Sequence, residues 1–308
     1  MSTKDIKNID ELEKQVKNIR HNIIRMITKA GSGHPGGALG LAEVFGALYL
    51  AKLLRYNPKD SADPNRDILV ISNGHVCPVL YATLAEAGLI DYSELDTFRQ
   101  FGSRLQGHPE RKMLPWVEAS SGPLGEGISQ AAGMAYALKY LLPKNDRLVV
   151  AIVGDGEMNE GECWEAIMFA NKYHLNNLII MIDHNNIQLS GNTSDVMPLP
   201  DLDEALYGIT DNILEKMECY DLKELIQELG DQFNDMRQGN LDGPLIILLD
   251  TKPGKDVSFM EGDYRWHGKA PSAEQAEQAY RDIESAARKR RGDNFSDTKE
   301  EGENYYDD

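Results

Sequence analysis

The feature that most constrains this chain is a Gly-Asp-Gly turn between two apolar runs. Residues 148–153 read Leu-Val-Val-Ala-Ile-Val and are followed directly by Gly154, Asp155 and Gly156. A short apolar run bounded by glycine is typical of a buried strand in a parallel sheet. A second apolar run, residues 178–182, begins roughly one βαβ unit further along the chain. We therefore predict two buried parallel strands joined by a helix.

Oxygen ligands follow both predicted strands. Asp155 comes directly after the first, and Asn185 comes shortly after the second. Open α/β sheets bind ligands at the carboxyl ends of their strands, so these two side chains are expected to converge. Gly154 and Gly156 leave room for a ligand, and the helix after Gly156 is expected to direct backbone amides at its phosphates. A few protein oxygens together with phosphates are the ligands that Mg²⁺ takes, so the stretch predicts a magnesium diphosphate site.

Composition narrows the class of protein. The chain has 308 residues, of which 41% are hydrophobic and 27% charged, as in a globular protein with a sizeable core. Its net charge of −18 argues against a surface for nucleic acid or anionic membranes. The N-terminus is polar, no apolar run is long enough to span a bilayer, and the three cysteines form no C-x-x-C pair. We therefore expect a cytoplasmic protein with no nucleic-acid or membrane partner.

Strands and helices alternate along the chain, which predicts an α/β fold with a doubly wound, mainly parallel sheet flanked by helices. Strands are expected at residues 67–72, 148–153, 178–182 and 244–250, and helices at residues 10–30, 39–54, 81–88, 128–142 and 221–236. No linker or repeat divides the chain, so residues 1–292 are expected to form one domain. Residues 293–308 are acidic and nearly free of aliphatic side chains, which predicts a disordered tail.

Histidines form a second candidate site. Four of the seven lie in loops beside glycine or proline: His34, His75, His108 and His267. Histidine is the side chain best suited to move protons near neutral pH, and four such loops could surround one polar substrate. Spacing alone does not show that they converge. The other three are interpreted as ordinary surface or core residues: His21, His174 and His184.

Several motifs resemble those of transketolases, in the same order along the chain. The loop at residues 31–37 reads Gly-Ser-Gly-His-Pro-Gly-Gly, and further matches lie at residues 73–75, 107–110, 122–125 and 267–271. The stretch from Gly154 to Asn185 resembles the thiamine diphosphate signature. The resemblance covers about residues 10–275. It implies the thiamine diphosphate-binding fold of a transketolase N-terminal domain.

The resemblance also implies roles for individual residues. His34, His108 and His267 would contact the sugar and assist its proton transfers. The cofactor would be lined by His75, Gly122, Pro123, Leu124, Gly154, Gly156, Glu160, Asn185 and His267. Asp155, Asn185 and the backbone carbonyl of Ile187 would hold Mg²⁺, or Ca²⁺, since oxygen ligation tolerates both. Glu160 matches a family carboxylate at the subunit interface; the alternative is an acid favoured by the dipole at a helix N-terminus.

A transketolase moves a two-carbon ketol unit from a ketose phosphate to an aldose, using thiamine diphosphate as its cofactor. A full-length member continues through a second domain, which supplies the glutamate that activates the cofactor, and a third. The residues after 275 are few and charged. We therefore expect the N-terminal subunit of a split transketolase, inactive without a separate C-terminal subunit in an α2β2 assembly.

One segment departs from the family pattern. Transketolases usually carry Phe-Gly-Trp followed by Asp-Gly-His-Asp there, whereas this chain has Tyr-Gly-Ile-Thr at residues 207–210 and Glu-Cys-Tyr-Asp at residues 218–221. The departure leaves the substrates open among ordinary, branched and sulfonated sugars. It also leaves open a non-catalytic paralog that binds a partner or cofactor. A related thiamine diphosphate enzyme, such as deoxyxylulose phosphate synthase or a ketoacid dehydrogenase component, is a further alternative, although the loops at residues 33–37 and 107–110 favour transketolase.

Overall fold

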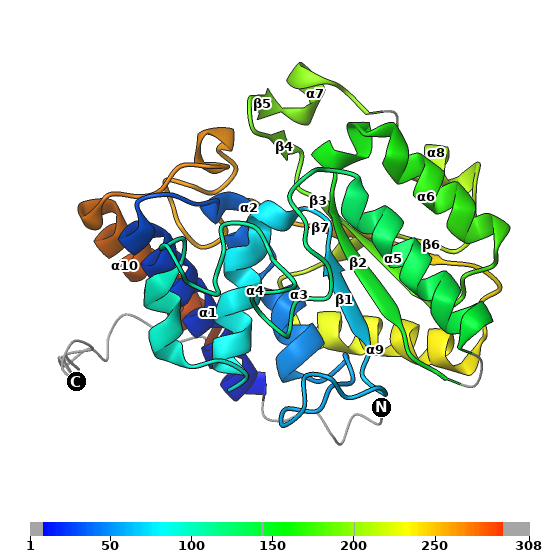
Figure 1. Cartoon of the computed structure of the whole chain (residues 1–308). Helices are drawn as coiled ribbons and strands as arrows, with labels where there is room; N and C mark the ends of the chain where they lie inside the picture. The colour runs from blue at the N-terminus through cyan, green and yellow to red at the C-terminus, as the bar shows by residue number, and fades with distance from the viewer. Residues whose placement is uncertain (1–8, 143–144, 200, 292–308) are drawn as a thin grey trace.

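A five-stranded sheet lies at the centre of the computed structural model, which describes residues 9–142, 145–199 and 201–291. The strand order is β1-β2-β3-β7-β6, and every neighbouring pair is parallel. The strands are β1 (Ile68–Ile71), β2 (Val149–Gly154), β3 (Leu178–His184), β6 (Ile213–Glu218) and β7 (Leu245–Asp250). Helices cover both faces, so the predicted α/β fold with a parallel sheet is confirmed (Figure 1).

Successive residues of a strand pack on opposite faces of this sheet. In β2, Val150 and Ile152 belong to the core on one face, whereas Ala151 and Val153 belong to the core on the other. Side chains of a strand alternate in direction, so a strand that is apolar throughout is buried on both sides. One face is covered by α5 (Glu126–Tyr136) and α6 (Gly161–Lys172), and the other core includes residues of α1 (Ile9–Ala30), α4 (Cys77–Glu86), α9 (Leu222–Gln238) and α10 (Ala273–Arg291) (Figure 1).

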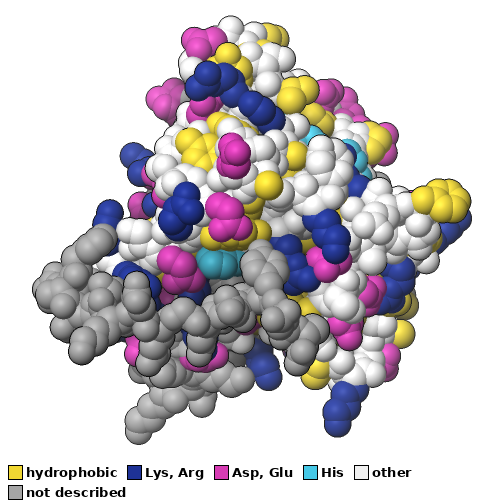
Figure 2. All heavy atoms as spheres, turned by 90° about the vertical axis from the view of Figure 1, so that its left-hand side faces the viewer, with side chains coloured by type: hydrophobic (Ala, Val, Ile, Leu, Met, Phe, Trp, Pro, Cys, Tyr) yellow, Lys and Arg dark blue, Asp and Glu magenta, His cyan; other side chains and the backbone are white. Residues whose placement is uncertain are grey.

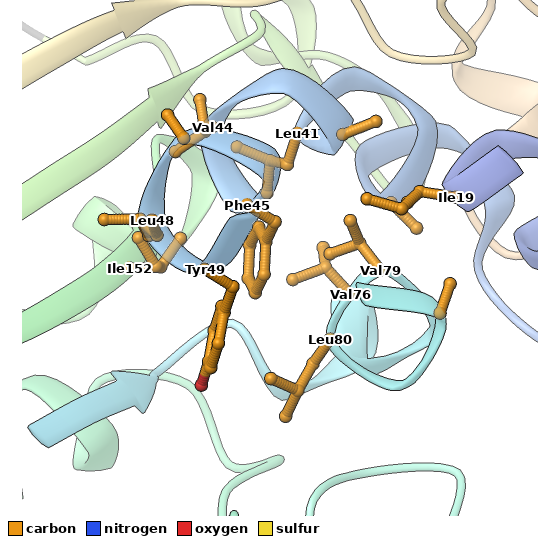
Figure 3. Close-up of a cluster of buried hydrophobic side chains, with 14 of the residues drawn as sticks. Ile19, Leu41, Val44, Phe45, Leu48, Tyr49, Val76, Val79, Leu80 and Ile152 are labelled. Carbon is orange, nitrogen blue, oxygen red and sulfur yellow. The ribbon is translucent and has the colours of Figure 1, made fainter. Parts of the chain in front are cut away.

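The helix expected at residues 39–54 is interrupted. The chain forms α2 (Pro35–Gly40), α3 (Ala42–Phe45) and a π-helical turn η1 (Gly46–Leu50), which ends before residue 54. Every residue from 35 to 50 is buried, so packing on all sides, rather than one apolar stripe, determines the path of the segment. Figure 3 shows Val44, Phe45 and Leu48 of this segment in the same buried cluster as Val76 and Val79.

The edge strand β6 was not predicted. Its sequence mixes charged and apolar residues, its pairing with β7 is irregular between Leu214 and Met217, and Lys216 has a φ of 51°. β6 pairs with one neighbour only, so it does not need the continuous apolar run of a central strand. The segment that departs from the transketolase pattern therefore forms the end of α8 (Leu202–Tyr207) and this edge strand.

The remaining structural predictions have mixed outcomes. The expected helix at residues 128–142 is α5 followed by a π-helical turn η4 (Ala137–Leu141), and the helix expected at residues 81–88 begins earlier, as α4. The predicted tail, residues 293–308, lies outside the described residues. Within the described part of the chain, no helix is both long and apolar enough to cross a membrane. On the coloured part of the face in Figure 2, acidic and basic side chains are interspersed.

A buried charge network joins three helices beneath this packing. Arg20 of α1 is fully buried and forms ion pairs with Glu43 of α3, at 2.5 Å, and with Asp256, at 3.3 Å. Arg290, in the last turn of α10, pairs with the same Asp256 at 2.7 Å. A buried ion pair adds little net stability, but removing one partner leaves an uncompensated charge in the core. Arg20 is therefore required for the helices to pack as they do.

Replacing Arg20 with Met should destabilise the protein by about 3–5 kcal/mol, because Glu43 loses its buried partner and Asp256 keeps only Arg290 and Lys255. Urea-induced unfolding measures the change. Arg25→Met is the matched control: Arg25 lies on the same helix and pairs with Asp96, but it is 41% exposed, so its loss should cost less than about 1 kcal/mol. Equal losses of stability in Arg20→Met and Arg25→Met would show that the buried ion pairs of Arg20 have no special role.

The same network predicts a dependence of stability on pH. Burial raises the pKa of Asp256, but Arg20 and Arg290 outweigh it and lower the pKa to about 2. Because the folded pKa lies below that of the unfolded chain, the stabilisation is complete above about pH 4 and disappears as the pH falls towards about 2. The free energy of unfolding should therefore fall less steeply over this range in Asp256→Asn than in the wild type. Parallel curves would show that Asp256 is not the group responsible.

Candidate functional site

Polar residues gather at the carboxyl ends of four of the five strands, namely β1, β2, β3 and β7. β1 leads into a short turn, η2 (Gly74–Val76), and β2 is followed by Asp155. β3 is followed by Asn185, and β7 by Thr251. Parallel strands present these ends at one edge of the sheet, where loop side chains can surround a ligand. This edge lies at the top of the sheet in Figure 1, below β4 (Ile187–Gln188) and β5 (Gly191–Asn192).

The structure brings the four loop histidines together. His34 precedes α2, His75 lies in η2, His108 lies in the loop before α5, and His267 follows the turn η6 (Tyr264–Trp266). The His34 ring centroid lies 5.3 Å from that of His75, 6.0 Å from that of His108 and 5.6 Å from that of His267. The rings of His75 and His267 are 4.8 Å apart. Four segments far apart in sequence thus form one imidazole cluster.

Burial keeps this cluster uncharged. It lowers the pKa of His34 to about 4, with further lowering by His267, Arg99 and His108. Burial is also the largest cause of the lowered pKa of His75, which lies well below its usual value, and of those of His108 and His267. The rings are therefore neutral near pH 7, and each has a nitrogen able to accept a proton.

Arg99 belongs to this cluster and was not predicted from the sequence. Its guanidinium lies 3.5 Å from Nδ1 of His34 and 3.4 Å from the carbonyl oxygen of Gly107. The backbone of Arg99 has a φ of 60°, a conformation that is costly for a residue with a side chain and that is often found at functional sites. Its position depends on the folding of the loop before His108, which no local sequence pattern reveals.

The Gly-Asp-Gly turn holds Asp155 between two strand ends. One carboxylate oxygen, Oδ1, accepts a hydrogen bond from the Gly156 N–H at 2.7 Å, and Oδ2 accepts one from the Asn186 N–H at 2.6 Å. The predicted helix directly after Gly156 is wrong: a 3₁₀ turn, η5 (Gly156–Asn159), comes first, and α6 begins at Gly161. The Gly156 amide is used by Asp155 and belongs to this turn rather than to an α-helix N-terminus.

The other two expected metal ligands follow β3, beside Asp155. The side-chain oxygen of Asn185 accepts a hydrogen bond from the Ile187 N–H at 3.0 Å, and its amide donates to Asp183 at 2.9 Å. No group of three His, Cys, Asp or Glu side chains is arranged to hold a metal within the described ranges. The expected metal ligands differ from such a group, since they are the carboxylate of Asp155, the side-chain amide of Asn185 and the backbone carbonyl of Ile187.

A second buried carboxylate, Asp183, also escaped prediction. It is the penultimate residue of β3, 2% exposed, and accepts a hydrogen bond from the Thr251 hydroxyl. Burial raises the pKa of Asp183 to about 6. Burial and the neighbouring Asp183 raise the pKa of Asp155 to about 7. An acid at the end of an apolar run was the signal that could have identified Asp183.

Unpaired polar atoms and close-packed glycines form a cradle at this edge. Both side-chain amide atoms of Asn73 and the hydroxyl of Ser121 are buried without a hydrogen-bond partner. Such atoms are costly unless a ligand or water satisfies them. Gly122 has a φ of 150°, and a Cβ there would lie 3.4 Å from the His108 ring. A Cβ on Gly156 would lie 2.9 Å from the Gln188 side chain. The residues present therefore fit a polar ligand held close to the backbone.

The remaining predicted site residues lie at the rim. Pro123 and Leu124 are exposed, in the turn that precedes α5. Glu160 is exposed at the N-cap of α6 and makes no capping hydrogen bond with its side chain. A Cβ on Gly125 would lie 3.2 Å from Cβ of Glu160. Glu160 thus lies beside this turn, at the helix N-terminus where an acid is favoured.

Comparison with known proteins identifies the family. Residues 12–287 match the family described as transketolase, thiamine diphosphate binding domain. One of the subunits named for an apulose-4-phosphate transketolase, from Phocaeicola vulgatus, is 37% identical over 89% of this chain and 94% of that protein. The 6-deoxy-6-sulfo-D-fructose transketolase subunit SqwG of a Clostridium species is 34% identical over 89% and 96%, respectively. Human transketolase is 33% identical over 91% of this chain but 43% of its own length.

Solved structures agree with this result. Transketolase from Campylobacter jejuni superposes with a TM-score of 0.81 and 30% identity, covering 92% of this chain and 46% of that one. Transketolase from Leishmania mexicana gives a TM-score of 0.76 with 28% identity, over 91% and 46%. The chain thus spans about half the length of the solved transketolases that it matches. The family match and the shared fold establish that this chain belongs to the transketolase family, in which it corresponds to the thiamine diphosphate binding domain.

Proposed function

We propose that this chain is the N-terminal subunit of a split transketolase, which transfers a two-carbon ketol unit from a ketose phosphate to an aldose with thiamine diphosphate as cofactor. The observation that carries the proposal is the neutral four-histidine cluster at the same sheet edge as the Gly-Asp-Gly turn. Relatives named as single subunits of apulose-4-phosphate transketolases support the two-chain arrangement, because the chain spans 94% and 96% of their lengths.

The cradle supports the proposed cofactor. The cofactor supplies carbanion chemistry when bound. Asp155, the Asn185 side-chain oxygen and the Ile187 carbonyl would hold Mg²⁺, or Ca²⁺. The closeness of two buried acids, Asp155 and Asp183, supports a cation here, because a divalent ion would offset the repulsion between their charged forms. The cofactor would be lined by His75, Gly122, Pro123, Leu124, Gly154, Gly156, Asn185 and His267, with Glu160 at the rim.

His34, His108 and His267 would handle the protons of the sugar. As neutral imidazoles they can accept a proton from a hydroxyl, and their lowered pKa values favour giving it back. Arg99, beside His34, adds a positive charge that would stabilise a developing alkoxide. The residues of this chain thus bind the sugar, orient it and move its protons.

Exposed apolar side chains at the rim support a partner subunit. Leu189 is 67% exposed, and a Cβ on Gly268 would lie within 3.6 Å of both His34 and Leu189. Leu124, Val196 and Met197 are also exposed. Apolar surface beside a polar site is typical of a protein interface. We propose that a C-terminal transketolase subunit docks here, in an α2β2 assembly that supplies the glutamate activating the cofactor.

The substrates and location complete the proposal. Relatives that are named for apulose 4-phosphate and for a sulfonated fructose support branched or sulfonated sugars alongside ordinary pentose phosphates. All three cysteines are buried and free of disulfides, which is compatible with the reducing cytoplasm.

The first test is ketol transfer by the purified chain with and without its C-terminal partner, in the presence of thiamine diphosphate and magnesium. Xylulose 5-phosphate with ribose 5-phosphate, a branched and a sulfonated donor should be compared. Transfer should appear only with both chains, because the proposed C-terminal subunit would supply the activating glutamate. Transfer by the single chain would refute the split arrangement. A pair that binds the cofactor yet transfers none of these sugars would use a different one, whereas a pair that does neither would be a non-catalytic paralog.

Replacing Asp155 with Ala should weaken magnesium-dependent binding of thiamine diphosphate at least about a hundredfold, because the only carboxylate of the expected metal set is lost. Isothermal titration calorimetry of the single chain measures the change. Asp195→Ala removes an exposed acid near the same edge and should leave the affinity unchanged. Retained affinity in Asp155→Ala would exclude Asp155 as the metal ligand.

A further inference from the structure

One buried carboxylate beside the cradle has no role in the proposal so far. Glu157 is the second residue of the turn η5 and is 2% exposed. Another acid, Glu160, lies close enough to raise its pKa further. Glu157 is therefore held by hydrogen bonds rather than by an ion pair. Burying an acid in this way is costly unless its oxygens are satisfied.

Three donors satisfy it. Oε1 of Glu157 accepts hydrogen bonds from the Ser72 hydroxyl at 2.5 Å and from the Gly125 N–H at 2.8 Å. Oε2 accepts one from the Gly154 N–H at 3.1 Å. The Ser72 hydroxyl in turn accepts a hydrogen bond from the Ile128 N–H at 3.0 Å. Burial raises the pKa of Glu157, and these three donors oppose the rise, because each favours the ionised acid.

These contacts join segments that are distant in sequence. Ser72 lies directly after β1, Gly125 ends the turn at residues 122–125, and Gly154 opens the Gly-Asp-Gly turn. The two turns contain all three glycines assigned to the cofactor: Gly122, Gly154 and Gly156. Glu157 is itself fixed, because its carbonyl oxygen accepts hydrogen bonds from the Glu160 N–H and the Cys163 thiol. One side chain thereby sets the separation of two backbone segments.

We propose that Glu157 is a positioning residue that holds the 122–125 turn against the Gly-Asp-Gly turn at the separation required to bind the diphosphate of the cofactor. The inference rests on the proposed function and extends it to a residue with no contact to the ligand. Glu157, which lies beneath the cradle, would then contribute to the affinity for the cofactor without touching it. The site is then preformed in this chain before any partner docks.

Glu157→Gln tests the role with the smallest change of shape. A glutamine retains one acceptor oxygen, which can serve Ser72 and Gly125, but its NH₂ group then faces the Gly154 N–H, donor against donor. Breaking this one contact should raise the Kd for thiamine diphosphate, at saturating magnesium, about tenfold. Glu157→Ala removes all three contacts and should raise the Kd further. Calorimetry on the full single chain gives these values without any need for activity.

Two further measurements separate positioning from general stability. Glu228→Gln removes an exposed acid from α9 and should change neither the Kd nor the unfolding temperature. Ser72→Ala should also raise the Kd, and the effect of the Ser72→Ala/Glu157→Ala double variant should be smaller than the product of the two single effects, because Glu157→Ala already removes the Ser72 contact. In the two-chain enzyme, Glu157→Gln should raise the cofactor KM and leave kcat at saturating cofactor unchanged.

Each contrary outcome has a distinct meaning. A lower unfolding temperature with an unchanged Kd in Glu157→Gln would overturn the inference and leave a purely structural role. A lower kcat at saturating cofactor with an unchanged Kd would also overturn it, by placing Glu157 in the chemistry. Binding by the wild type with no effect of either Glu157 variant would overturn the inference alone. A wild-type chain that does not bind thiamine diphosphate, even with its partner present, would overturn the proposed function together with it.

Discussion

The parallel pairing of five strands is the constraint on which the rest of the structure depends. Each inner strand is buried on both faces, so its side chains belong to two cores at once. The strands therefore offer no surface for a ligand, and polar residues are displaced to their ends. All carboxyl ends lie at one edge, and residues from η2, the Gly-Asp-Gly turn and the turn after β3 meet there. The position of the site therefore follows from the parallel arrangement of the strands.

Burial acts in opposite directions on the two halves of this edge. It removes the positive charge of the histidines, because desolvation disfavours the protonated ring. It also opposes the negative charge of Asp155 and Asp183, which lie close to each other. Glu157 shows a third arrangement, since backbone N–H groups and a hydroxyl satisfy its oxygens. The edge thus contains a region suited to proton transfer beside one suited to a cation.

Sequence patterns predicted the parts of the molecule that follow from local periodicity or from strongly apolar runs. The inner strands and the long helices α1 and α9 lie close to their expected positions. The single helix expected at residues 39–54 was wrong: the segment is divided into α2, α3 and η1, and every residue from 35 to 50 is buried. The edge strand β6 failed because one-sided pairing does not require an apolar run. The residues of the site likewise divide into those marked by a local sequence pattern and those defined by contacts in the folded chain.

Glycine and proline marked the four histidine loops, and the structure brought these rings together. Arg99, Asp183 and Glu157 carry no such local mark. Each is defined by what it touches: a histidine 65 positions away for Arg99, Thr251 for Asp183, and the end of β1 for Glu157. Such contacts arise only when the chain is folded, so motif spacing does not reveal Arg99 or Glu157, whereas Asp183 could have been identified as an acid at the end of an apolar run.

The uncharged state of the histidine cluster has a kinetic consequence. A protein with a net charge of −18 repels anionic molecules at a distance, and neutral imidazoles do nothing to offset this field. The positively charged side chain that contacts these rings is Arg99, whose guanidinium lies 3.5 Å from Nδ1 of His34. A sugar phosphate or thiamine diphosphate would therefore approach the isolated chain slowly, and added salt would speed its arrival by screening the repulsion. In the assembled enzyme, the capture rate would depend on the charges that the partner presents around the same opening.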